Sequence, residues 1–318
     1  MRVSTSMIFN SGTIGMQGRQ SDLYKVQNQL STGRKILSPE DDPIGASEVL
    51  QVTQSKGVNK QFLDNQANAQ SQLTYLESTL GSVGDALLRV GELAKQGDNA
   101  SLNAAQRGMI AAELKGIQSN LVGLANTQDG TGQYIFAGYK STTKPFTPIT
   151  QTTPPATYSL GNTYVTYSGD AGKPTLSVTS SKDMEVAENG LDVFMQVKDA
   201  SGNVTGRSLF DSIQNLINNM DGSLPYSAAT QAQGLADVSS ALTHTLTVRA
   251  SVGARQNSLD GLTSAGEDVS FLYDSRLSEL QDLDYTEAVS RFTNYKSQLE
   301  AAQLTFKQIS QLSLFNIL

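Results

Sequence analysis

Apolar residues at heptad spacing run along both ends of this 318-residue chain. Near the start they recur every seven residues, at Phe9, Met16, Leu23, Leu30 and Leu37. Such a seam predicts a helix over about residues 5–31 that packs against another helix, and Gly33 is placed to cap it. Near the other end the spacing alternates between three and four, at Phe292, Tyr295, Leu299, Ala302, Phe306 and Ile309. Each seam needs a partner, so we expect the two ends to pair as a coiled coil.

Longer helices are predicted between these ends. Asp42 before Pro43 is typical of a helix start, and an unbroken three–four pattern predicts a helix over residues 44–95. Asn103 and Gln106 have the spacing of a capping box. They predict the start of a second helix, which we expect to fold back on the first.

The middle of the chain has a different composition. Residues 142–206 are rich in Thr, Pro, Gly and Tyr, with candidate strands over residues 163–167 and 175–179. Helical patterns resume at Ser208, with Asp211 as its capping partner. The sequence therefore predicts a mainly α, elongated helical bundle with a small β-rich insert. We expect three parts: residues 1–35 with 286–318, residues 36–141 with 207–285, and residues 142–206.

The composition argues against most chemistries. A net charge of -7 without a basic run argues against a nucleic-acid partner. The chain has no cysteine and one histidine, His244, which excludes thiol chemistry and a His–His metal pair within the chain. We interpret His244 as a solvated helix residue, and we expect no catalytic residue, cofactor or metal. No apolar run approaches the ~20 residues of a membrane helix, so membrane insertion is not expected.

Acidic clusters at residues 40–42 and at Asp282 and Asp284 each precede a predicted helix. Carboxylates there cap free amides and favour the positive end of the helix dipole, so we interpret them as caps and not as metal ligands. Arg255 and Arg276 fall on seam positions. Each either pairs with a carboxylate on a facing helix or extends past the seam into solvent.

The terminal helices are expected to be mobile in the monomer. Pairing the two ends leaves their outer faces uncovered, so neighbouring subunits are needed to order them. The last seven residues, 312–318, include five large apolar ones. Exposed apolar segments aggregate, which predicts that this tail needs a partner before assembly.

Two signatures resemble those of the bacterial flagellin superfamily. Residues 30–36, Leu-Ser-Thr-Gly-Arg-Lys-Ile, and the Asp-Asp-Pro of residues 41–43 resemble the N-terminal signature. Residues 252–257 and 282–288 resemble the C-terminal region. The resemblance covers roughly residues 1–146 and 205–318.

Within this superfamily, residues 1–5 and 134–140 are similar to the members at the junction of hook and filament. The resemblance implies a non-enzymatic structural adaptor that joins the flagellar hook to the filament as a ring of subunits. It implies five partners: further copies of the chain, another hook-associated junction protein, the hook protein, the filament flagellin and a cytoplasmic export chaperone. It also implies an extracellular location in the flagellum, reached through the type III export channel without a cleaved signal peptide.

Two sets of residues are expected to serve these roles. The assembly interface is predicted at the two seams, Phe9, Met16, Leu23, Leu30, Phe292, Tyr295, Leu299, Phe306 and Ile309. The resemblance implies that the chaperone binds the C-terminal helix, at Phe306, Ile309, Leu312, Leu314 and Phe315. Three alternatives stay open: a minor filament flagellin, a secreted coiled-coil adhesin or tip protein, and an enzyme with a site in the insert.

Overall fold

The computed structural model describes residues 5–149, 158–159, 163–198 and 202–315, with only the backbone at residues 5, 6, 8 and 309–315. It confirms a mainly α protein with a small β-rich insert. The chain forms two compact units. Unit 1 consists of residues 1–60 with 267–318, and unit 2 of residues 61–266. The three-part division drawn from the sequence remains a prediction.

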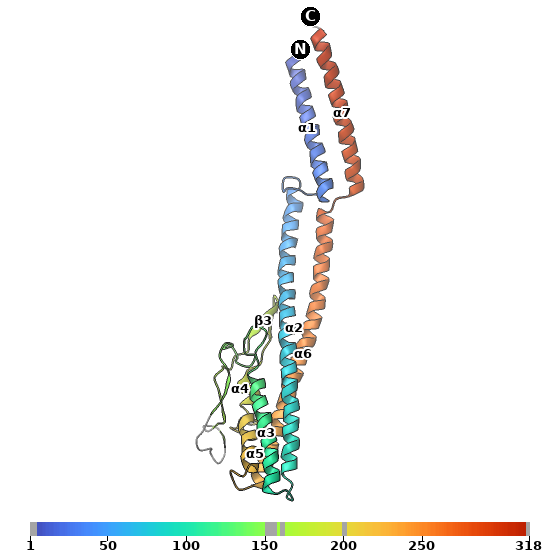
Figure 1. The fold of residues 1–318 in the computed structure, drawn as a ribbon. Helices are drawn as coiled ribbons and strands as arrows, with labels where there is room; N and C mark the ends of the chain where they lie inside the picture. Colours follow the sequence, from blue (N-terminus) through green and yellow to red (C-terminus); the bar gives the residue numbers. More distant parts are fainter. Residues whose placement is uncertain (1–4, 150–157, 160–162, 199–201, 316–318) are drawn as a thin grey trace. The chain divides into compact units, whose positions relative to one another are not determined.

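Unit 1 contains both terminal helices. They are α1 (Thr5–Thr32) and α7 (Tyr285–Phe315), which lie side by side (Figure 1). The unit also holds the start of α2 (Pro43–Gly97) and the end of α6 (Ala228–Gln281). Gly33 follows α1 with a φ of 69°, and its amide donates to the carbonyl of Gln29 at 2.8 Å. This confirms the predicted glycine cap.

The connectors between the helices of unit 1 bond to each other. The Leu283 amide donates to the Gly33 carbonyl at 3.0 Å, and the Lys35 amide donates to the Gln281 carbonyl at 2.6 Å. Leu37, which continues the heptad spacing, lies in this connector beyond α1 and is 37% exposed. It therefore does not extend the helical seam.

Two predicted caps of unit 1 are confirmed. The Gly45 amide donates to the carboxylate of Asp42 at 3.0 Å, at the start of α2. The Thr286 amide donates to the carboxylate of Asp284 at 2.8 Å, at the start of α7. Both carboxylates satisfy amides that a helix start leaves without a partner.

Unit 2 is a helical bundle. The rest of α2, the first part of α6, α3 (Ala104–Ala125) and α5 (Leu209–Met220) supply its core. Arg89 of α2 donates to Glu113 of α3 at 2.8 Å, which confirms that α3 folds back on α2. The capping boxes predicted at the starts of α3 and α5 are both present. Fully buried side chains of this core include Leu73, Leu80, Leu87, Leu114 and Phe210.

The insert forms two small antiparallel sheets beside these helices. Strand β1 (Phe146–Pro148) pairs with β2 (Val165–Tyr167), and β3 (Thr175–Thr179) pairs with β4 (Lys182–Glu185). The short helix α4 (Gly190–Phe194) follows. The candidate strands of the sequence are thus confirmed, with β2 shorter than predicted.

Aromatic rings join the insert to the helices of unit 2. The ring of Phe194 lies 5.0 Å from that of Phe136, 5.3 Å from that of Phe146 and 5.9 Å from that of Phe210, measured between centroids. Phe136 lies in a run of turns over residues 135–139. The turns allow its ring to point into the core, where it is fully buried.

Candidate assembly interface

One aromatic contact joins the N-terminal part of α1 to the C-terminal part of α7. The ring of Phe9 on α1 meets that of Phe306 on α7 edge to face, with centroids 5.4 Å apart. A Cβ atom at Gly12 would lie 2.9 Å from Cδ2 of Phe306, so the ring occupies the space that glycine leaves. Edge-to-face pairs stabilise contacts beyond the area they bury.

The described side chains of the predicted seams are only half-buried. This holds for Phe9, Met16, Leu23, Leu30, Phe292, Tyr295, Leu299 and Phe306. Val26 on α1 and Ala288 on α7 are the buried ones, at 3% and 0% exposure. The helix pair therefore removes only part of its apolar surface from water.

Several predicted residues lie where side chains are not described. Ile309, Leu312, Leu314 and Phe315 belong to α7, but only the backbone is described there. The apolar tail residues Ile317 and Leu318 lie outside the described residues altogether. The chaperone surface therefore stays a prediction.

Unit 1 presents uncovered apolar surface on several sides. A hollow of about 310 Å³ lies between α1 and α7, with Gly15, Met16 and Ala302 among its lining residues. Large apolar side chains point outward elsewhere in the unit: Met7, Ile14, Ile44, Leu50, Phe271, Leu272 and Leu304 are all at least 64% exposed. Residues 5–18 contain no charged residue. Such surfaces mark protein interaction sites.

A charged cluster joins the C-terminal end of α1 to the connector that follows it. The carboxylate of Asp41 accepts hydrogen bonds from the amides of Leu37 and Ser38, at 3.0 and 3.1 Å. Lys25 Nζ lies 2.6 Å from it. The Lys25 contact, followed by the two amides, holds the pKa of Asp41 below its ordinary value. Asp41 thus stabilises the connector and does not cap α2, which corrects the interpretation for this member of the cluster.

Gln29 is a buried polar residue of α1 that the heptad pattern did not predict. Its side chain is 5% exposed and donates through Nε2 to the carbonyl of Lys35 at 2.7 Å. It lies three residues after the buried Val26, one turn further along α1. A polar residue at that spacing is the signal that could have identified it.

The two seam arginines both have carboxylate partners. Arg276 donates through Nε to Glu48 of α2 at 3.2 Å, which is the pairing with a facing helix. Arg255 instead bonds the buried carboxylate of Glu188, in the segment after β4. That carboxylate also lies 2.6 Å from Lys173 Nζ. Arg255 therefore ties α6 to the insert, a role that heptad spacing does not reveal.

His244 is not solvated. Its side chain is 18% exposed. Its Nε2 lies 3.1 Å from the backbone carbonyl oxygen of Asp192 in α4. The expectation of a solvated helix residue was wrong, because α4 covers this turn of α6.

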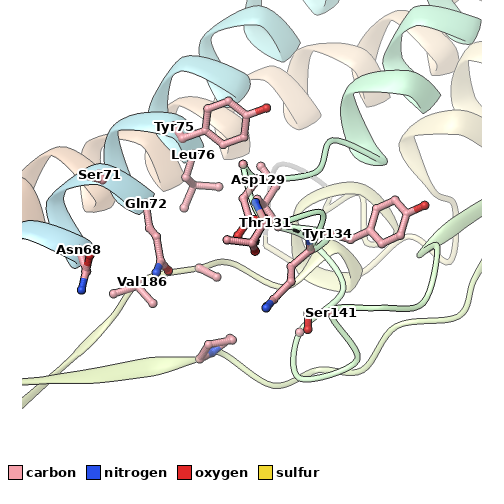
Figure 2. Close-up of a pocket in the computed structure, with 16 residues that line it drawn as sticks. Asn68, Ser71, Gln72, Tyr75, Leu76, Asp129, Thr131, Tyr134, Ser141 and Val186 are labelled. Carbon is pink, nitrogen blue, oxygen red and sulfur yellow. Dashed lines mark hydrogen bonds between the residues drawn. The ribbon is translucent and has the colours of Figure 1, made fainter. Parts of the chain in front are cut away.

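Unit 2 contains a hollow of about 310 Å³ between α2 and the segments around β3 and β4 (Figure 2). Tyr75 and Gln72 of α2 line one side of it, and Asp129 and Tyr134 belong to the segment that lines another. The residues that line the hollow include no histidine, lysine or arginine. The carboxylate of Asp129 accepts hydrogen bonds from the amides of Thr131 and Gln133. The hydroxyl of Thr131 also donates to this carboxylate at 2.7 Å, so Asp129 holds the turn over residues 129–133 together.

The described part of the chain shows neither a metal-binding cluster nor a membrane-spanning helix. No group of three or more His, Cys, Asp or Glu side chains is arranged there to hold a metal ion. No helix within those residues combines the length and the apolar character that crossing a membrane requires.

Comparisons with known proteins agree with this architecture. The family model of the bacterial flagellin N-terminal helical region matches residues 3–141, and that of the C-terminal helical region matches residues 235–318. Flagellar hook-associated protein 3 of Escherichia coli K12 is 29% identical over 329 residues, covering 100% of this chain and 99% of the relative.

Solved structures show the same fold. Flagellar hook-associated protein 3 from Legionella pneumophila superposes with a TM-score of 0.64 at 22% identity, covering 73% of this chain and 98% of that one. A structure of the flagellar junction protein FlgL from the same organism gives 0.58 at 21% identity, with coverage of 74% and 99%. With both flagellin models matched and the full length shared with hook-associated protein 3, the chain belongs to the bacterial flagellin family.

Proposed function

We propose that this chain is a structural adaptor that joins the flagellar hook to the flagellin filament. The observation that carries the proposal is similarity to hook-associated protein 3 along the whole chain, and not only at the shared terminal helices. A filament flagellin would share the N- and C-terminal regions, but it would not be expected to share the middle of the chain with a junction protein.

Assembly proceeds through unit 1. The half-buried seam of α1 and α7 and the outward apolar side chains favour contacts with further copies, which form a ring. In the monomer these ends are mobile, because their surface is uncovered. Hydrogen exchange tests this directly: amides of residues 9–30 should exchange fast in the monomer and slowly in the assembled flagellum. Strong protection in the monomer would contradict it.

The other partners are the hook protein, the filament flagellin and another hook-associated junction protein. Before export, a cytoplasmic chaperone covers the C-terminal end of α7. Residues 301–318 carry a single charge, Lys307, which favours an apolar binding surface around Phe306. Deleting residues 312–318 should abolish incorporation and leave unit 2 folded. The chain leaves the cell through the flagellar export channel without a cleaved signal peptide, and it functions outside the cell.

Deletion of the gene, followed by electron microscopy of the cell surface, tests the function. The expected cells carry hooks without filaments and release filament subunits into the medium. Restoring the gene should restore the filaments. Filaments of normal length on the deletion strain would contradict the proposal and favour a minor flagellin.

A further inference from the structure

Unit 2 has an apolar groove that its own elements leave open. The groove lies between α2 and α6 and measures about 660 Å³. Its apolar walls are formed by large and small side chains, Leu88, Leu235 and Leu242 with Gly91, Ala232 and Ala236. Leu88 remains 53% exposed. A concave apolar surface of this kind fits a convex partner.

The same unit carries a convex surface of matching character, the outer side of α3. Met109 projects from it and is 72% exposed. Four of the exposed residues along this side of the helix are small, Ala105, Ala112, Gly116 and Gly123. A Cβ atom added at Gly116 or Gly123 would meet no atom of the chain within 4 Å. Small residues of this kind let another backbone approach closely.

The charged side chains of α3, and two of the three on the rim of the groove, already have partners inside unit 2. Each of the three charged side chains of α3 has a partner inside unit 2. The pairs are Glu113 with Arg89, Lys115 with Asp221, and Arg107 with the ring of Tyr226. On the rim of the groove, Glu92 accepts from Arg89 at 3.0 Å, and Asp98 accepts from the hydroxyl of Tyr226 at 2.8 Å. Lys95 on the same rim is exposed, and its long side chain can keep the ammonium group in water. The outer side of α3 can therefore enter an apolar groove without burying an unpaired charge.

The groove and α3 lie on different sides of α2. Leu88 lines the groove towards α6, while its neighbour Arg89 reaches Glu113 of α3. Consecutive residues of a helix point about 100° apart, so one copy can use both surfaces at once. Two grooves facing each other would leave a void, because both are concave.

We infer that the groove between α2 and α6 receives the outer side of α3 from a second copy of this chain. Because the contact joins two different surfaces, it can repeat from one subunit to the next. The repeated contact forms a closed ring when the rotation between neighbouring subunits divides a full turn evenly. This inference rests on the proposed function, because it adds a second contact between copies to the one made by unit 1.

Disulfide trapping tests the contact, since the chain has no cysteine of its own. The variant carrying both Leu88→Cys and Met109→Cys is expressed in the deletion strain, and isolated flagella are oxidised. Non-reducing electrophoresis should show a ladder of covalent multimers. Leu88→Cys alone and Met109→Cys alone should stay monomeric, and cells that express both single variants should give a dimer and nothing larger.

The matched control pairs Leu88→Cys with Val204→Cys, which is 54% exposed in the same unit, and it should give no ladder. Dimers from Leu88→Cys alone would show that two grooves face each other and would overturn the inference. Flagella that assemble with both cysteines in place and form no covalent multimers would overturn it too.

A substitution on α3 gives an independent result. Gly116→Arg places a large charged side chain where the chain has open space, so the purified monomer should keep its melting temperature. Incorporation into flagella should be lost. Normal incorporation of a folded Gly116→Arg chain would contradict the inference and leave the hook-to-filament role intact, since only filaments on the deletion strain test that role.

Discussion

In unit 2 a continuous apolar core runs over four helices and the insert, whereas the described side chains of unit 1 include three buried apolar ones, Val26, Leu283 and Ala288. Both units are made of long helices with similar three–four spacing. They differ in what covers the outer side of each seam. In unit 2 the chain folds back and supplies α3, α5 and the insert, while in unit 1 the chain supplies little more than the facing helix.

The polar groups follow the same division. In unit 2, buried amide side chains bond to backbone carbonyls: Gln231 donates to Ala94 at 2.7 Å and Gln118 to Phe210 at 3.1 Å. In unit 1 the ion pair of Arg276 and Glu48 is largely exposed. We therefore expect unit 2 to be stable alone, and unit 1 to gain most of its stability from other chains that cover it.

The largest effect is expected from a buried ion pair of unit 2. Arg207 donates to Asp237 at 2.6 and 3.0 Å, and Asp237 is 3% exposed. Arg207→Met leaves that carboxylate without its charge partner and should lower the free energy of unfolding by about 3–5 kcal/mol. Urea denaturation followed by circular dichroism measures it. As a control, Arg276→Met in unit 1 should cost less than about 1 kcal/mol; equal losses would contradict the comparison.

Substitutions that create a cavity should also destabilise the two units by different amounts. Leu80 is fully buried, so Leu80→Ala should lower the free energy of unfolding by about 2–5 kcal/mol. Met16 is half-buried in the terminal seam, and Met16→Ala should leave the melting temperature of the monomer nearly unchanged. Incorporation into flagella should be reduced more by Met16→Ala than by Leu80→Ala. A monomer destabilised as strongly by Met16→Ala would mean that unit 1 is already ordered.

A smaller effect is expected in the insert at alkaline pH. The hydroxyl of Tyr167 donates to the carbonyls of Phe136 and Asp170, at 3.0 and 2.7 Å. Burial raises the pKa of Tyr167 to about 12, whereas an unfolded tyrosine titrates near ~10. Its contribution is therefore present below pH ~10 and lost as pH rises towards ~12. Tyr167→Phe should lose about 1 kcal/mol at neutral pH and show a flatter alkaline decline in urea denaturation. An equally steep decline would show that another group controls it.

The smallest effect is expected at the C-terminal end of α1. Because the pKa of Asp41 is lowered, its contribution is present above the ordinary carboxyl pKa and is lost as pH falls through the folded value. Lys25→Met should bring the pKa of Asp41 back towards its ordinary value, with a loss of stability below about 1 kcal/mol. NMR titration of the carboxylate measures this. An unchanged pKa would show that the amides of Leu37 and Ser38 are sufficient.

Local signals predicted most of the fold. The capping pair Asn103 and Gln106, the glycine cap at Gly33 and the start of α2 at Pro43 each depend on a few neighbouring residues, so the sequence displays them. Contacts between distant segments left no such signal. His244 meets α4, and Arg255 meets Glu188 after β4.

The candidate interface was predictable only as a pattern. Heptad spacing identified which residues face the seam, because a helix repeats that spacing along one side. It could not show that these residues would stay half-buried, since exposure depends on what lies beyond the pair. The groove between α2 and α6 was missed for a related reason: the small residues Gly91 and Ala236 carry no hydrophobic periodicity.

The contact of Phe9 with Phe306 also determines when unit 1 can form. These rings belong to the first and last helices, so their pairing closes a loop of nearly the whole chain. Closing long loops costs entropy and slows folding, and during synthesis α1 emerges long before α7 exists. We therefore expect α1 to remain unpaired until translation ends, so that a newly made chain spends its first moments with unit 2 able to fold and unit 1 still open.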